Sequence, residues 1–389
     1  MPIRYPRAWI LLVLAVSLAG AFALRAQSPA TIADQLSTAE RVKKPGWWPT
    51  KGSAPRSDYV GPAACAACHS DIAHTQRGTD MALSAMPPGQ SDFLTAQPKV
   101  TFKQGPYSYE ITRSGQNELF SVTDGKQTIS EPLLWAIGSG INGQSYLLEH
   151  QGKLYEARLS YYKAYKDFGV TPNHPSAPDE SLEKAIGRHI SEDEAPKCFG
   201  CHTTASSTSD KFDPTHALAG ITCEACHGPG ATHVAAKKSG MEDTGIGVEL
   251  NPATLSPPDS VDFCGACHRT WWDVNLAGLS GIGTLRFPVY RLEKSRCWGK
   301  GDARVTCMAC HDPHRPLVRD SASYDGNCLS CHASSVSAKL TADHPGAACK
   351  VATQKCASCH MPKYEVPDMH TKFTDHMIRV VRKDEVFPN

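Results

Sequence analysis

The chain has no excess of either charge, because its 389 residues include 40 lysines and arginines against 39 aspartates and glutamates. Without a basic excess it offers no broad electrostatic surface for nucleic acid or for an anionic membrane. After Leu24 it also lacks any apolar run long enough to cross a bilayer. We therefore expect no nucleic-acid partner, and membrane contact only through the N-terminal segment.

Cysteine is absent from Val100 to Tyr165, yet the chain has 16 cysteines, and 14 of them stand in seven Cys-x-x-Cys-His repeats. The paired cysteines are Cys65 and Cys68, Cys198 and Cys201, Cys223 and Cys226, Cys264 and Cys267, Cys307 and Cys310, Cys328 and Cys331, and Cys356 and Cys359. The histidines that follow them are His69, His202, His227, His268, His311, His332 and His360.

This spacing is typical of covalent haem attachment. Two thiols three positions apart form thioethers to one porphyrin, and the next residue brings its imidazole beneath the iron. The alternative is zinc, since a lone Cys-x-x-Cys is often half of a tetrahedral site. Zinc pairs do not require a following histidine, and an odd number of pairs cannot be matched evenly. The repeats therefore predict seven haem c groups, with the motif histidines as proximal iron ligands.

The N-terminus has the pattern of an export signal. Arg4 and Arg7 precede an apolar run from Ala8 to Leu24, and small residues follow. We expect a signal peptide over residues 1–26, with an uncleaved membrane anchor as the alternative. A Pro- and Gly-rich linker is expected over 27–60. Export to the periplasm or cell surface agrees with the cysteine usage, because c-type haem attachment belongs outside the bacterial cytoplasm.

The remaining chain, residues 61–385, is predicted to be one heptahaem cytochrome c domain. We expect a mainly α and irregular fold, with short helices and loops around a haem stack, because closely spaced motifs force close packing. The cysteine-free stretch alternates apolar and polar residues between Gly and Asn turns, which indicates strands. A small antiparallel β insertion is therefore expected near residues 100–165, as a structural lid.

Histidines outside the motifs could supply the second axial ligand of each iron. Of the 17 histidines, seven stand in the motifs and ten do not, so every iron could have two. His314 is favoured because Pro313 turns the chain and directs it toward another haem. The predicted distal ligands are His174, His189, His216, His233, His314, His344, His370 and His376, whereas His74 and His150 are less favoured.

Methionine and cysteine side chains outside the motifs could bind iron or form a disulfide. Met81 follows the first motif and could be the distal ligand of haem 1, which would raise its potential; packing is the alternative for Met81 and Met86. Cys297 and Cys349 lie outside the motifs and could form a disulfide. Two thiols, or a sulfur ligand from Cys297, are the alternatives.

Three segments carry a resemblance to a known family. They are residues 221–230 (ITCEACHGPG), residues 307–314 (CMACHDPH), and residues 359–362 (CHMP) with the tail from His370 to His376. The chain resembles exported multihaem cytochromes c related to the tetrahaem cytochrome c of nitrifying bacteria (cytochrome c-552/4-like). The wider superfamily includes pentahaem nitrite reductase and octahaem hydroxylamine oxidoreductase.

The resemblance implies an electron carrier. Such proteins commonly have a histidine where Met81 stands here. The motif lysine of the nitrite reductases is absent, and we find no counterpart of the additional haem and cross-linking tyrosine of the hydroxylamine oxidoreductases.

We expect a carrier without catalytic residues, in which electrons hop between haem edges. Its partners would be other redox proteins, such as a quinol-oxidising complex, other cytochromes or a terminal reductase. One alternative is an oxidoreductase that acts on a small nitrogen or sulfur compound at a five-coordinate haem. Another is a subunit of a larger respiratory or filamentous assembly.

Overall fold

The computed structural model describes residues 54–97, 99–115, 117–208, 211–240, 251–298, 304–333, 349 and 351–389. The predicted signal peptide (1–26), most of the predicted linker (27–60) and the candidate ligand His344 lie outside these residues. In the part of the chain that is described, no helix has both the length and the apolar character needed to cross a membrane.

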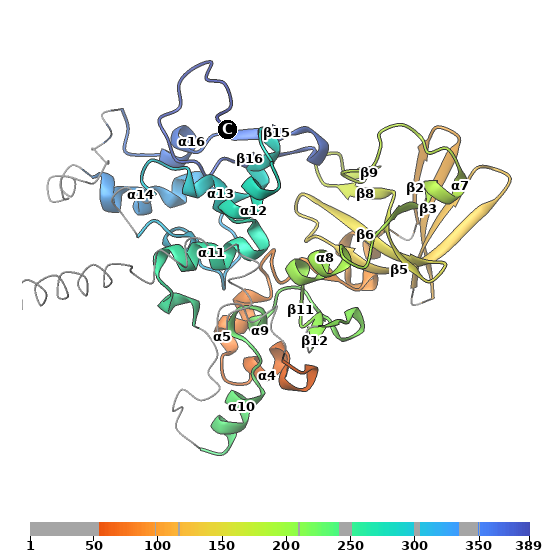
Figure 1. Ribbon diagram of the computed structural model, residues 1–389, viewed down its shortest axis with the longest axis horizontal. Helices are drawn as coiled ribbons and strands as arrows, with labels where there is room; N and C mark the ends of the chain where they lie inside the picture. Colours follow the sequence, from red (N-terminus) through yellow and green to blue (C-terminus); the bar gives the residue numbers. More distant parts are fainter. Residues whose placement is uncertain are drawn as a thin grey trace, which may run out of the picture.

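A ten-stranded antiparallel sheet forms one lobe of the molecule (Figure 1). Its central path runs β10-β7-β6-β5-β4-β3-β2, with β1 beside β5, β8 beside β6, and β9 beside β8. The strands are β1 (Ala85–Met86), β2 (Lys99–Gln104), β3 (Tyr107–Ser114), β4 (Asn117–Thr123), β5 (Thr128–Ile137), β6 (Gly143–His150), β7 (Lys153–Ala157), β8 (Leu159–Tyr162), β9 (Asp167–Val170) and β10 (Gly187–His189).

The alternation of buried and outward-facing residues along the strands, together with tight turns between the strands, explains this sheet. In β4, Phe120 and Val122 are fully buried while the residues between them face outward. Gln151 and Gly152 join β6 to β7 with φ of 51° and 73°, so both adopt the left-handed conformation of a tight hairpin turn. Successive hairpins of this kind place strands that are neighbours in sequence side by side.

The prediction of a mainly α and irregular fold with a small β insertion is wrong. The sheet is large, and it extends beyond residues 100–165 at both ends, from Ala85 in β1 to His189 in β10. It also has its own apolar core, which includes Tyr109, Tyr146 and Leu148. Strands of two to four residues are too short to show alternation, and they pair only because the longer strands provide open edges.

The second lobe consists of short helices and small hairpins. Its helices, with those flanking the sheet, are η2 (Arg56–Asp58), α4 (Pro62–Ala66), α5 (Ser70–Gln76), η3 (Pro88–Gln90), α6 (Asp92–Ala96), α7 (Leu182–Ala185), α8 (Ala195–His202), η4 (Pro214–His216), α9 (Cys223–His227), α10 (Ala231–Lys238), η5 (Pro252–Thr254), α11 (Pro257–His268), α12 (Trp271–Leu276), η6 (Ile282–Arg286), α13 (Pro288–Glu293), η7 (Cys307–Ala309), η8 (Ser321–Tyr324), α14 (Asp325–His332), α16 (Cys356–His360) and η9 (Pro367–Met369). The hairpins pair β11 (Thr203–Thr204) with β14 (Leu218–Ala219), β12 (Ser207–Thr208) with β13 (Lys211–Phe212), and β15 (Lys363–Val366) with β16 (Thr371–Thr374).

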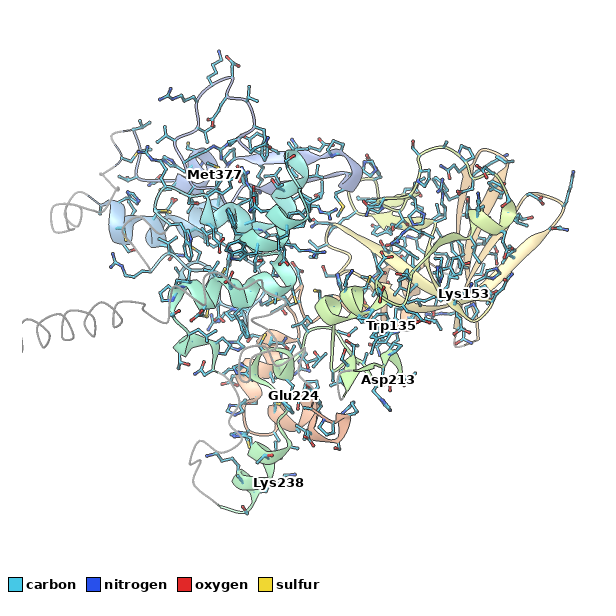
Figure 2. The ribbon with its side chains drawn as sticks, viewed as in Figure 1. Trp135, Lys153, Asp213, Glu224, Lys238 and Met377 are labelled. Atoms are coloured by element: carbon cyan, nitrogen blue, oxygen red, sulfur yellow. The ribbon has the colours of Figure 1, made fainter. Side chains whose placement is uncertain are left out.

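An aromatic cluster joins the two lobes. Trp135 of β5 lies at the boundary beside α8 (Figure 2). The ring of Phe199 in α8 meets the Trp135 ring edge-on at 5.6 Å between centroids, and Phe212 packs on its other side at 5.3 Å. Because α8 carries the second Cys-x-x-Cys-His motif, this packing places that motif directly against the sheet.

Candidate haem-binding sites

Most of the motifs lie in the last turn of a short helix. The helices α8, α9, α11, α14 and α16 each end at the motif histidine. A helical turn brings positions i and i+3 to one face, so both thiols of a motif point the same way. This is the local geometry that two thioether bonds to one porphyrin require.

Two motif histidines are oriented by backbone carbonyl groups. His202 lies with Nδ1 3.1 Å from the carbonyl oxygen of Ser84, and His360 with Nδ1 2.8 Å from that of Arg379. A carbonyl only accepts, so Nδ1 carries the proton and donates it. The other ring nitrogen, Nε2, is then left with its lone pair available for a metal.

Burial keeps several of these imidazoles neutral. It lowers the pKa of His202, His268 and His311 below the ordinary value, and it lowers the pKa of His376 to about 4. A histidine must be neutral to bind a metal ion. These four side chains are therefore in the form that an iron ligand needs at neutral pH.

In two pairs of histidines, the ring centroids lie at a separation that would suit one metal ion between them. The rings of His227 and His314 are nearly parallel, at 8°, with centroids 6.0 Å apart. Those of His311 and His376 are 6.3 Å apart. An imidazole nitrogen binds a metal at roughly 2 Å, so two rings on opposite sides of one ion have centres about 6 Å apart. Direct ring stacking would bring them closer.

Each pair joins a motif histidine to a predicted distal ligand from a distant part of the chain. His314 follows the fifth motif, but its ring lies opposite that of the third motif's histidine; its role as a ligand to another haem stays a prediction. His376 comes after the last motif and faces the histidine of the fifth. Nδ1 of His376 lies 3.1 Å from the carbonyl oxygen of Thr374, which again leaves Nε2 as the ligand atom. The residues present therefore fit haem.

Three other predicted distal ligands contact carboxylate or aromatic side chains. Nε2 of His174 lies 3.4 Å from a carboxylate oxygen of Glu156. His189 packs its ring beside that of Tyr155, at 5.6 Å. The exposed His216 points Nδ1 at the Asp213 carboxylate, 2.6 Å away. No second histidine ring is recorded opposite these three in the described residues.

The last three candidates differ again. The hydroxyl of Tyr165 lies 2.7 Å from Nδ1 of His370, which also packs edge-on against Tyr162. His233 stands on α10, just after the third motif. Met81 is half-buried, and its carbonyl oxygen accepts a hydrogen bond from the backbone of Ile221. Their roles as ligands stay predictions.

Cysteines of different motifs contact one another. Cys65 shares a hydrogen bond with Cys223, which raises the pKa of Cys65. Cys307 shares one with Cys264, which raises the pKa of Cys307. Because each thiol would bind the edge of its own porphyrin, such contacts place the edges of neighbouring groups side by side.

A cysteine of the sixth motif also contacts a cysteine of the seventh motif. In the second and fourth motifs, a cysteine of each motif contacts a backbone carbonyl group of the other. Burial raises the pKa of Cys328 to about 12, and a hydrogen bond with Cys356 contributes. Between α8 and α11, Sγ of Cys201 lies 3.7 Å from the carbonyl oxygen of Ala266, and Sγ of Cys267 lies 3.9 Å from that of Gly200.

In the described residues, no three or more His, Cys, Asp or Glu side chains gather so that they could hold a metal ion. Cys297 and Cys349 are not joined to each other: Cys297 is half-buried, whereas Cys349 is exposed. The expected disulfide between them is not formed in this structure.

Sequence reasoning missed the groups that orient the histidines. The acceptors at Ser84, Thr374 and Arg379 are main-chain carbonyl groups. Every residue has such a group, so no side-chain pattern could have revealed them. Sequence reasoning also missed two acidic side chains beside the motifs, Glu224 and Asp325, which are considered below.

Comparison with known proteins agrees with this geometry. Residues 158–228 match the family described as cytochrome c554 and c-prime. The chain is 27% identical over 221 residues to the multiheme cytochrome MtrA of Shewanella baltica, a match that covers 46% of this chain and 64% of that protein. It is 24% identical over 172 residues to the high-molecular-weight cytochrome c of Nitratidesulfovibrio vulgaris, covering 43% of this chain and 25% of that one.

Over these parts of its length, the chain is similar to proteins that are named as multihaem or c-type cytochromes. Each spans less than two thirds of the length of its curated relative. No solved structure matches the chain. The cofactor that the relatives imply is covalently bound haem c.

Proposed function

We propose that this chain is an exported heptahaem electron carrier. The fourteen motif cysteines would form the thioethers, and the seven motif histidines would be the proximal ligands. The observation that carries the proposal is that two pairs of histidine rings lie with centroids 6.0 Å and 6.3 Å apart, and each pair includes one motif histidine. The resemblance to the tetrahaem carrier of nitrifying bacteria belongs to the same proposal and rests on the motif segments quoted above.

When bound, haem c supplies one-electron chemistry between ferric and ferrous iron. The protein's own residues attach, orient and enclose it. Carbonyl groups such as that of Ser84 fix the tautomer of the ligand histidine, and burial keeps the imidazole neutral. A second histidine such as His376 would hold the iron together with the motif histidine, and an iron held by two protein ligands would favour electron transfer over substrate binding.

The contacts between motifs support a continuous route. The first motif touches the third through Cys65 and Cys223. The third packs on the fourth, where Cys226 joins the cluster around Phe263 and Ala266. The second lies beside the fourth, as a side branch next to the sheet.

The route continues toward the C-terminal end of the lobe. Cys264 and Cys307 share the apolar cluster that connects the fourth and fifth motifs. The ring of Tyr324, directly before α14, packs edge-on against His311 at 5.5 Å and so connects the fifth motif to the sixth. Cys356 then brings the seventh motif to the sixth. Electrons would hop along this series and meet redox-partner proteins, such as a quinol-oxidising complex, another cytochrome or a terminal reductase, at its ends.

The domain organisation is part of the proposal. Residues 1–26 would direct export, residues 27–60 would link, and residues 61–385 would form the heptahaem domain. Covalent haem attachment outside the bacterial cytoplasm supports a periplasmic or extracellular location.

The test begins with a count of haems. Intact-mass measurement and pyridine haemochrome analysis of the purified protein should give seven covalent haems per chain. Low-temperature electron paramagnetic resonance of the oxidised protein should then show low-spin haems that do not change with nitrite, hydroxylamine or sulfite. A large high-spin signal that shifts with one of these compounds would overturn the carrier in favour of an enzyme.

A further inference from the structure

A buried carboxylate connects the first and third motifs. Glu224 lies in α9 between the two cysteines of the third motif and is 2% exposed (Figure 2). Its Oε1 accepts the backbone N–H groups of Val60 and Gly230, and its Oε2 accepts that of Gly61, each at 2.8 Å. Val60 and Gly61 directly precede α4, the helix that leads into the first motif. One side chain thus fixes two motifs to each other.

The same device connects the sixth and seventh motifs. Asp325 begins α14, which carries the sixth motif. Its Oδ2 accepts the N–H of Lys355 at 2.6 Å and its Oδ1 that of Cys356 at 2.8 Å, where α16 and the seventh motif begin. These backbone hydrogen bonds, first that of Cys356, lower the pKa of Asp325.

In both places the carboxylate accompanies a contact between thiols. Cys65 meets Cys223 beside Glu224, and Cys328 meets Cys356 beside Asp325. A carboxylate that accepts successive N–H groups fixes the backbone just before a motif, and thereby the position of the first cysteine that follows. The recurrence of this contact, with different residues in different helices, argues against a chance contact.

We propose that Glu224 and Asp325 are positioning residues that hold the first and third, and the sixth and seventh, haem sites in contact, and that their negative charges lower the potentials of these two pairs. The inference rests on the proposed function. Acceptance of several N–H bonds favours the charged form of a carboxylate. A fixed negative charge near an iron stabilises the ferric state, and burial reduces its screening by water. The effect should be larger at Glu224 than at the half-buried Asp325.

The first test removes each charge with little change in shape. Glu224→Gln and Asp325→Asn are compared with wild type by optical redox titration and by low-temperature electron paramagnetic resonance. In Glu224→Gln, one pair of haems should become easier to reduce by about tenfold in the ferric-to-ferrous ratio, which is about 59 mV for a one-electron couple. Asp325→Asn should shift a different pair by a smaller amount.

Matched controls remove nearby carboxylates that do not connect two motifs. Asp71 lies on α5 close to the first motif, and its carboxylate accepts a hydrogen bond from the hydroxyl of Ser70 in its own helix. The carboxylate of Asp320 accepts the N–H of Ala322 and the hydroxyl of Ser323, before the sixth motif. Asp71→Asn and Asp320→Asn should leave the potentials nearly unchanged, because exposed charges are screened by water and salt.

A further variant separates charge from packing. Glu224→Asp keeps the charge but shortens the side chain, so the potentials should stay near those of wild type while the magnetic coupling between the paired haems changes. If the potentials of Glu224→Gln match those of Asp71→Asn, the electrostatic role of Glu224 is overturned. The same conclusion follows if Glu224→Asp shifts the potentials as much as Glu224→Gln does. If Glu224→Gln does not fold, the comparison of Asp325→Asn with its control Asp320→Asn tests whether the carboxylate lowers the haem potentials. A wild-type chain without covalent haem would instead refute the proposed function.

Discussion

The histidines of this chain differ in what their Nδ1 atoms contact. His202, His360 and His376 point Nδ1 at main-chain carbonyl oxygens, which leaves the lone pair of Nε2 available for a metal ion. His150 instead lies between two carboxylates, with Nδ1 2.7 Å from Glu131 and Nε2 2.7 Å from Glu183. Both of its nitrogens are therefore engaged with carboxylates.

Replacement of His376 should open one iron site. In His376→Ala the ring that faces His311 at 6.3 Å is lost. About one of seven haems should change from low spin to high spin, measured by electron paramagnetic resonance, and should bind added imidazole. His74→Ala is the control, since His74 is exposed on α5 and is among the histidines less favoured as ligands. An equal high-spin signal in both variants would contradict the assignment of His376.

His150 should stabilise the sheet most at mildly acidic pH. Burial by itself lowers its pKa, but Glu131 and Glu183 outweigh burial and raise it above 6.5. A raised pKa in the folded state adds stability that is complete below pH 6.5 and is lost as the pH rises through the folded value. His150→Gln should therefore cost about 1 kcal/mol near pH 6, and less near pH 9.

Urea unfolding of this variant and of wild type at the two pH values measures the difference. Gln151→Ala, which removes a neighbouring amide that also binds Glu183 but has no titratable group, is the control. A cost of His150→Gln that grows with pH would be inconsistent with a raised pKa.

At the scale of elements, the segment after β16 depends on a buried ion pair. Arg291 of α13 binds both carboxylate oxygens of Asp375, at 2.8 Å and 2.9 Å, and neither side chain is exposed. Arg379 binds the same carboxylate at 2.7 Å. His376 is the next residue along the chain, so this pair determines where its ring lies.

Removal of Arg291 should disturb both folding and the nearby iron site. Arg291→Met leaves Asp375 buried with one cation fewer, and breaking a buried pair costs about 3 to 5 kcal/mol. Chemical unfolding should show this loss, together with a partial high-spin signal from displacement of His376. Arg315→Met, which removes an exposed partner of Asp312, should cost less than about 1 kcal/mol. Similar losses of unfolding free energy in the two variants would argue against the buried ion pair as the contact that fixes the segment after β16.

At the scale of the whole molecule, the contacts between the sheet and the second lobe include an apolar cluster and an exposed hydrogen bond. The cluster includes Phe199, Trp135 and Leu147, and the hydrogen bond is between Tyr165 and His370. The first is apolar and buried, whereas Tyr165 is 56% exposed. The cluster should therefore carry most of the coupling between the lobes.

Truncation of Phe199 should separate the unfolding of the lobes. Phe199→Ala removes a ring that is 1% exposed and should cost about 3 to 5 kcal/mol. Hydrogen exchange of the strand amides, followed with increasing denaturant, reports the sheet, and the Soret band reports the second lobe. The two transitions should coincide in wild type and diverge in the variant. Phe120 is buried within the core of the sheet, so Phe120→Ala is the control and should lower the denaturant concentration at which the sheet unfolds. If the two transitions still coincide in Phe199→Ala, Phe199 does not couple the lobes.

Sequence predicted some of these features better than others. Strands such as β3 and β4 were indicated by local alternation, whereas the short β1 and β10 depend on partners at the edges of β5 and β7. The extent of the sheet was underestimated for this reason. The two histidines whose rings lie near His227 and His311 were among the candidates named from sequence, but the pairing of these rings was not predicted, because it joins segments far apart in the chain.

The sequence by itself determined the chemistry: seven Cys-x-x-Cys-His motifs, spare histidines and an N-terminal export pattern, all carried by residues adjacent along the chain. Tertiary structure decided which histidine faces which motif, which thiols meet and how large the sheet becomes. Glu224 shows the difference most clearly. Its place between two cysteines is visible in the sequence, yet its binding of Val60 and Gly61 depends on packing between segments more than 160 residues apart.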